Sequence, residues 1–197
     1  MAEALNDVAL DQLFRTARTF NGYLDRPVER DQLTAIWDLM KMGPTSANSL
    51  PARLVWCVSE EAKQKLAECC SEANKQKVLS APVSVVIGMD LRFYDELPRL
   101  FPHADARSWF AGDEAVANET AMRNSSLQGA YFIMAARALG LDTGPMSGFD
   151  GDAVNTAFFS DTPNVRVNFI STLGYGDPSS IFPRSPRPDF DEFNRLS

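Results

Sequence analysis

Hydrophobic and polar residues follow one another along the chain in patterns that predict helices separated by a few strands. Residues 8–18 and 29–42 both carry apolar side chains at the i, i+3, i+4, i+7 spacing of a single helix face. Gly43-Pro44 follows the second segment, and this pair is a common helix stop. We therefore expect two helices before residue 45.

Three runs rich in β-branched residues predict strands. They are 53–58 (RLVWCV), 83–89 (VSVVIGM) and 165–174 (VRVNFISTLG), and the second is apolar enough to be buried on both faces. Ser59 and the two acidic residues after it predict a helix start behind the first strand. A short helix is expected near 150–159, and another in the acidic tail.

The longest predicted helix covers residues 113–139 and ends at Gly140. Between residues 127 and 139 it is apolar nearly all round, so it must be covered on every side. This indicates a central helix. A place in a subunit interface and a place in the core of one chain fit the pattern equally well.

The arrangement of these elements indicates a single domain over residues 1–197 of the α+β class, with helices packed on one mixed sheet. Residues 91–112 interrupt the pattern with two prolines, several aromatic residues and a glycine. We interpret that segment as an excursion or lid.

Composition removes several functional classes. The 197 residues carry a net charge of -7, which argues against a nucleic-acid-binding protein. Three cysteines without a C-x-x-C pair favour a reducing cytosol, and His103, the only histidine, makes a metal site improbable. No signal peptide and no apolar stretch of membrane-spanning length is present, so we expect a cytoplasmic protein without a membrane partner.

Several catalytic motifs are absent from the sequence. It has no G-x-G-x-x-G after a strand, no Walker loop, no G-x-S-x-G elbow, and no tyrosine followed four residues later by lysine. A redox enzyme without these motifs depends on a bound cofactor for its chemistry. No side chain is singled out as catalytic.

Five short polar clusters remain as candidates for a site. Each has a simpler explanation alone: a polar loop after a helix, or a solvated cation at a helix end. The clusters are Arg18-Thr19, Pro44-Thr45-Ser46-Ala47-Asn48, Asn74 with Lys77, Gly144-Pro145-Met146-Ser147-Gly148, and Arg184 with Arg187 in the tail.

Together these clusters resemble the FMN-dependent nitroreductases from about residue 10 to the end of the chain. The similarity is closest to the malonic semialdehyde reductase subgroup of uracil breakdown. Four stretches carry that closer resemblance: residues 43–48, 100–110 (LFPHADARSWF), 123–126 (RNSS) and 138–150 (ALGLDTGPMSGFD). The resemblance implies a mainly antiparallel sheet flanked by helices, a long central helix and an intertwined homodimer.

The resemblance also implies roles for the clusters in holding FMN. Arg18, Thr19 and the tail arginines Arg184 and Arg187 would bind the phosphate. Pro44, Thr45, Ser46 and Asn48 would line the ribityl chain or the ring edge. Asn74 and Lys77 would contact the pyrimidine side, and Pro145, Met146, Ser147 and Gly148 would approach N5, where close backbone approach suits glycine. The chain departs from the family pattern at Ala17, Asn21, Leu50 and Ser147.

The implied activity is ping-pong hydride transfer from NADH or NADPH to a small electrophile. Under the subgroup resemblance that electrophile is malonic semialdehyde, reduced to 3-hydroxypropionate, with Arg53 or Arg107 as cations for its carboxylate. A general nitroaromatic, quinone or enone reductase is the alternative, and a flavin-binding module without turnover is another. The sequence does not choose between NADH and NADPH, nor say whether His103 touches substrate. A protein-interaction domain is less favoured, because the polar clusters adjoin buried elements.

Overall fold

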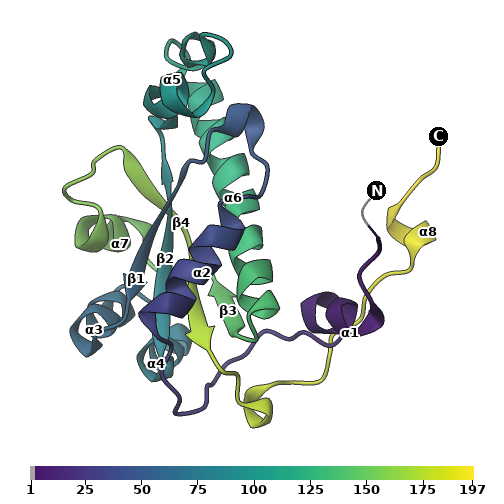
Figure 1. Ribbon diagram of the computed structural model, residues 1–197. Helices are drawn as coiled ribbons and strands as arrows, with labels where there is room; N and C mark the ends of the chain where they lie inside the picture. Colours follow the sequence, from purple (N-terminus) through teal and green to yellow (C-terminus); the bar gives the residue numbers. More distant parts are fainter. Residues whose placement is uncertain (1–2) are drawn as a thin grey trace.

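The computed structural model describes residues 3–197, and its centre is a four-stranded antiparallel sheet (Figure 1). The strands are β1 (Ala52–Cys57), β2 (Val83–Asp90), β3 (Asp142–Met146) and β4 (Val165–Gly174), in the spatial order β1-β2-β4-β3. The three predicted strands and the α+β class are confirmed. β3 is an additional strand that the sequence did not predict.

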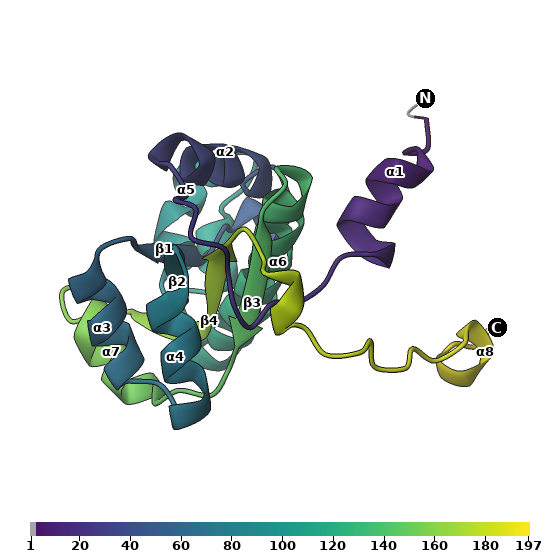
Figure 2. The same cartoon turned by 90° about the horizontal axis from the view of Figure 1, so that it is seen from below.

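Helices cover both faces of the sheet, as Figure 2 shows from below. On one face lie α2 (Arg30–Met40) and α6 (Glu114–Ala138), and on the other lie α3 (Glu60–Glu68), α4 (Glu72–Ser80) and α7 (Gly151–Phe158). Alternate residues of β2 point to opposite faces of the sheet. Val85 and Ile87 pack toward α2 and α6, and Val86 packs toward α3. This explains the continuous apolar run of that strand.

Helix α6 is the long central helix that the sequence predicts, and Asp113 caps its start by accepting a hydrogen bond from the Val116 backbone N–H. It approaches the sheet closely at Gly129, where an added Cβ would lie 2.4 Å from the Phe169 ring. Its other face stays exposed in one chain, with Met122 and Leu127 both partly open to solvent.

Residues 91–112 form short helical pieces at one end of α6: η3 (Phe93–Glu96), α5 (Leu97–Leu100) and η4 (Ala106–Trp109). Phe93 and Leu97 are fully buried there against Ala117 and Ala121 of α6. The excursion therefore has a small apolar cluster of its own and lies beside the loop that follows α2.

Two sequence predictions need correction. The first helix ends before residue 18, because α1 (Asp7–Leu10) and η1 (Asp11–Arg15) end at Arg15. The helix start predicted at Ser59 is confirmed, since Ser59 Oγ accepts a hydrogen bond from the Ala62 backbone N–H at 3.2 Å; the chain then breaks at Cys70-Ser71 between α3 and α4, where Cys70 bridges to Phe149. The predicted Gly-rich turn at 144–148 is instead the end of β3 and the loop after it. The remaining short elements are η2 (Ser46–Asn48), η5 (Pro178–Ser180) and α8 (Phe190–Phe193).

Candidate functional site

The edge strand β3 organises most of the predicted site. Thr19 forms an isolated parallel bridge with Thr143, and the Phe20 backbone N–H donates to the Thr143 carbonyl at 3.2 Å. These two segments of the chain lie so close together that a Cβ on Gly144 would be 2.7 Å from the Phe20 carbonyl oxygen. The segment carrying Arg18 and Thr19 is therefore fixed alongside the start of β3.

The loop after β3 meets the first turns of α4. The Asn74 side-chain amide donates to the Gly148 carbonyl at 3.1 Å, and the Ser71 backbone N–H donates to the same oxygen at 3.0 Å. Lys77 lies one turn further along α4 and is half-buried, whereas Ser147 is exposed. The structure thus brings Asn74 next to Gly148, with Pro145 and Met146 leading into this loop and Lys77 one turn further along α4.

A cleft of about 430 Å³ at the start of β3 is lined by four arginines. Arg18 donates to the Phe182 carbonyl, and Arg184 donates to the Ala17 carbonyl at 2.9 Å, so the C-terminal tail crosses the N-terminal segment here. Arg187 and Arg137 complete the cationic lining. Such a cluster in a chain of net charge -7 indicates an anion site.

Arg137 lines this cleft and was not among the residues that the sequence suggested. It lies in the last turn of α6, and its Nη1 donates to the Leu13 carbonyl at 2.9 Å. Burial lowers the pKa of its guanidinium, Asp142 raises that pKa, and the neighbouring charge of Arg184 lowers it again. Its buried Nε has no partner within residues 3–197. A phosphate in the cleft fits this cluster of like charges and this unpaired donor.

The loop after α2 lies elsewhere, toward the other end of α6 (Figure 1). The Ser46 backbone N–H donates to Asn124 Oδ1 at 2.8 Å, and the Asn48 side chain donates to the Leu100 carbonyl at 2.8 Å. Asn124 and Arg137 are roughly 20 Å apart by the helical rise per residue. A single chain therefore does not bring Pro44, Thr45, Ser46 and Asn48 together with the groups along β3.

This loop is strained. Ala47, Asn48 and Leu50 have φ values of 50°, 51° and 40°, in the left-handed region that favours glycine. Each such residue costs on the order of 1–3 kcal/mol, and the conformation persists only where the surrounding structure enforces it. Strain of this kind is concentrated at binding and catalytic sites, so the loop remains a candidate part of the functional site.

The two arginines predicted to bind a substrate carboxylate are both paired with carboxylates of this chain. Arg53 Nη2 lies 2.7 Å from Asp90 Oδ2, and its Nη1 donates to the Leu50 and Ala52 carbonyls. Arg107 lies 3.0 Å from Asp95, and its side chain stays 45% exposed. Arg53 thus contacts its own chain through both Nη atoms, and its side chain is 36% exposed against 45% for Arg107. His103 is exposed and packs edge-on against Phe101.

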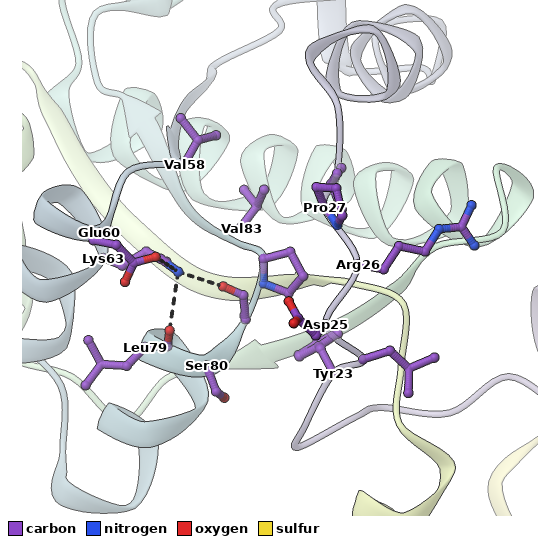
Figure 3. A pocket seen from close by; sticks show the side chains of 14 residues that line it. Tyr23, Asp25, Arg26, Pro27, Val58, Glu60, Lys63, Leu79, Ser80 and Val83 are labelled. Atoms are coloured by element: carbon purple, nitrogen blue, oxygen red, sulfur yellow. Dashed lines mark hydrogen bonds and ion pairs between the residues drawn. The ribbon is translucent and has the colours of Figure 1, made fainter.

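A second cavity, of about 560 Å³, lies between residues 23–28 and the ends of α3 and α4 (Figure 3). Its buried Lys63 donates to the Leu79 and Ala81 carbonyls at 3.3 and 3.2 Å and pairs with Glu60 at 2.7 Å. All these contacts lie within the chain, so Lys63 stabilises the C-terminal end of α4. We assign no ligand to this cavity.

Among residues 3–197, no helix combines the length and the apolar character that crossing a membrane requires. The same residues contain no group of three or more His, Cys, Asp or Glu side chains placed to hold a metal ion. Cys57, Cys69 and Cys70 are free thiols.

The sequence and the fold both resemble known proteins. The pattern of the "Nitroreductase family" matches residues 15–175. A protein of Burkholderia lata named "Putative NADH dehydrogenase/NAD(P)H nitroreductase" is 60% identical over 192 residues, which is 98% of each chain. A protein of the same name from Stenotrophomonas maltophilia is 56% identical over the whole of both chains.

Solved structures share the fold at lower identity. A "putative nitroreductase in complex with FMN" from Exiguobacterium sibiricum has a TM-score of 0.85 at 19% identity over all of both chains. A nitroreductase family protein from Streptococcus pneumoniae has a TM-score of 0.83 at 20% identity, covering 94% of this chain and 98% of its own.

Proposed function

The chain belongs to the nitroreductase family, and we propose that it is an FMN-dependent NAD(P)H oxidoreductase that works as a homodimer. The observation that carries this proposal is the alignment of an arginine-lined cleft, the strand β3 and the Asn74–Gly148 contact along one edge of the sheet. From Thr143 to Gly148, β3 and the loop after it cover at most roughly 17 Å. That length suits an elongated ligand with a phosphate at one end.

The cleft would hold the FMN phosphate. Arg18, Arg137, Arg184 and Arg187 supply guanidinium groups, which form charge-assisted and often bidentate hydrogen bonds with phosphate oxygens. Thr19, exposed at the bridge to Thr143, adds a hydroxyl. These residues neutralise the anion, and an anion in turn relieves the repulsion among them.

The other end of β3 would hold the flavin ring. Asn74 and Lys77 would offer an amide and a cation to its pyrimidine side, and the backbone of Ser147 and Gly148, which Asn74 contacts, would approach its reactive edge. The chemistry that FMN supplies when bound is hydride transfer at N5, from NADH or NADPH to a small electrophile. The protein orients the ring and stabilises the charge that reduction places on it.

A second copy of the chain would complete the site by bringing in the loop at 44–48. The N-terminal helix and the C-terminal tail project away from the body of one chain (Figure 2), and Phe193 and Leu196 of the tail are 80% and 86% exposed. The exposed face of α6 adds Met122 and Leu127. Apolar arms and an uncovered helix face are features of a two-fold dimer interface.

The three free thiols suit a cytoplasmic location.

The electron acceptor in this proposal is a small electrophile. The subgroup resemblance favours malonic semialdehyde, and the exposed side of Arg107 offers the cation that its carboxylate needs. Arg107 lies on the same excursion as Leu100, whose carbonyl accepts the Asn48 hydrogen bond, and this supports a position near the completed site. A nitroaromatic, quinone or enone acceptor needs no such cation.

Two measurements test the proposal. Purified protein supplied with FMN should show visible flavin absorbance, and NADH or NADPH should bleach it within the catalytic turnover time in a stopped-flow instrument. Bound flavin that stays oxidised would leave a binding module without turnover. Absence of flavin binding would refute the proposal altogether. Steady-state rates with malonic semialdehyde and with a nitroaromatic then separate the two acceptor classes.

A further inference from the structure

Three side chains of α6 hold the loop at residues 43–52. Asn124 Oδ1 accepts a hydrogen bond from the Ser46 backbone N–H at 2.8 Å, and Gln128 Oε1 accepts one from the Ala52 backbone N–H at 2.8 Å. The Tyr131 hydroxyl donates to the Pro44 carbonyl at 2.9 Å. These residues stand at i, i+4 and i+7, so they form one row along the helix, which we call the loop clamp.

The segment between the clamp's contacts needs external support. Ala47, Asn48 and Leu50 are all left-handed without being glycine. Inside the loop, the Asn48 and Ser49 backbone N–H groups donate to the Thr45 and Ser46 carbonyls at 3.0 Å each, and the Leu50 backbone N–H donates to Thr45 Oγ1 at 3.2 Å. Arg53 Nη1 donates to the Leu50 carbonyl at 3.0 Å. None of these contacts ties the loop to α6. The clamp fixes both ends, and this is the arrangement that keeps a strained backbone in place.

Two residues of the clamp are buried, whereas two polar side chains of the loop are exposed. Asn124 and Gln128 are 2% and 0% exposed, and Asn124 Nδ2 donates to the Thr120 carbonyl at 2.8 Å, which orients its oxygen toward Ser46. Gln128 Nε2 has no partner in the part of the chain that the structure describes. Gln128 therefore contributes through its oxygen alone. On the outer side, Ser46 and Asn48 face solvent.

We propose that Asn124 and Gln128 are positioning residues that hold the loop at 43–52 in its left-handed conformation, so that Thr45, Ser46 and Asn48 meet the flavin as a preformed set. This inference rests on the proposed function. A preformed set of donors binds more tightly because less conformational entropy is lost on binding.

The acceptor oxygen of Gln128 can be tested by matched variants. Gln128→Met keeps the length and the apolar stem of the side chain but removes the acceptor, and Gln128→Glu keeps an oxygen there. Ser125→Ala is the control, because Ser125 is equally buried on α6 and bonds to Asn168 rather than to the loop. Asn124→Ser serves as the second test variant should Gln128→Met not fold.

Two readouts are compared for each protein: amide hydrogen exchange of residues 46–52 without FMN, and the FMN dissociation constant. Gln128→Met should exchange these amides about tenfold faster and bind FMN about tenfold more weakly. Gln128→Glu keeps an acceptor oxygen but buries a carboxyl group, so both readouts should lie closer to wild type than those of Gln128→Met while the melting temperature falls. Ser125→Ala should lower the melting temperature but leave loop exchange and FMN affinity unchanged.

The outcomes separate the clamp from the proposed function. Unchanged loop exchange in folded Gln128→Met or Asn124→Ser would overturn the inference, and so would a loss of FMN affinity in Ser125→Ala as large as that in Gln128→Met. If Gln128→Met exchanges the amides of residues 46–52 faster, but neither it nor the wild-type protein binds FMN, the clamp is supported and the proposed function is refuted.

Discussion

The side-chain amide of Asn74 donates a hydrogen bond to the carbonyl oxygen of Gly148, 3.1 Å away. This contact joins the first turns of α4 to the loop after β3, although the two residues lie far apart in the sequence. It leaves no space at Gly148, since a Cβ there would be 2.7 Å from Asn74 Nδ2 and 2.9 Å from Ser71 Oγ. The geometry of this loop therefore depends on glycine.

Replacing that glycine should damage cofactor binding. In Gly148→Ala the new methyl group must displace Asn74 or Ser71, which moves groups that we assign to the flavin ring. Because the displaced groups are the ones assigned to the flavin ring, the FMN dissociation constant should rise about tenfold in a fluorescence titration, which corresponds to about 1.4 kcal/mol of binding free energy. Gly112→Ala is the matched control, because nothing lies within 4 Å of its added Cβ. Equal FMN affinity in the two variants would contradict the assignment.

The arginine cleft should recognise phosphate. Arg184→Gln removes one charge-assisted hydrogen bond donor, and FMN affinity should fall about tenfold or more while riboflavin affinity stays unchanged. Arg99→Gln is the control, since Arg99 is a surface arginine paired with Glu96 and remote from the cleft. Isothermal titration with both ligands measures the difference. A parallel loss of riboflavin affinity would place Arg184 outside the phosphate site.

Arg53 and Arg107 should behave differently on mutation. Arg53→Gln leaves the nearly buried Asp90 without its cation, so the free energy of unfolding should fall by about 1–3 kcal/mol. The KM for malonic semialdehyde should not change. Arg107→Gln should raise that KM about tenfold and alter stability by less than about 1 kcal/mol, since its pair with Asp95 is exposed. A nitroaromatic acceptor serves as the internal control. An Arg107 variant with unchanged KM for the semialdehyde would remove this residue from carboxylate recognition.

The thiols should respond to alkaline pH. Burial raises the pKa of Cys70 to about 11 and that of Cys57 to about 12, above the ordinary thiol value of 9.0. Because the folded state holds these protons more tightly than the unfolded state, stability is full below pH about 9 and falls as the pH rises through 11 and 12. At pH 8, iodoacetamide should label the more exposed Cys69 first, as read by mass spectrometry. Equal labelling of all three thiols in the folded protein would contradict this prediction, because it would show that Cys57 and Cys70 are accessible to the reagent.

The elements with strong periodicity could be predicted from the sequence, and β3 shows what could not. Gly144-Pro145 has the composition of a turn, yet it lies in a strand. β3 is at the edge of the sheet, where proline's missing N–H is tolerated. Gly144 is required because a Cβ would collide with Thr172 Oγ1 at 2.4 Å. Both reasons depend on neighbours far away in the sequence.

The candidate site shows the same limit. The sequence suggested its polar clusters, but it did not reveal Arg137, because a lone arginine near a helix end gives no sign of the arginines that gather around it. It also did not reveal that the loop at 44–48 and the β3 groups lie far apart along α6. Both the arginine cluster and the separation of the loop from β3 depend on how whole helices and strands are placed in the fold.

Subunit complementation tests the shared site most directly. One variant carries Gly148→Val in the β3 group, and the other carries Thr45→Val with Asn48→Ala in the loop. Each alone should oxidise NADH slowly in the presence of FMN. When the two are co-expressed equally, half of the dimers are mixed, and each mixed dimer has one site free of both defects. The account predicts recovery of about a quarter of wild-type activity. Activity no higher than the mean of the two parents would contradict it, because both groups would then serve a site within one chain.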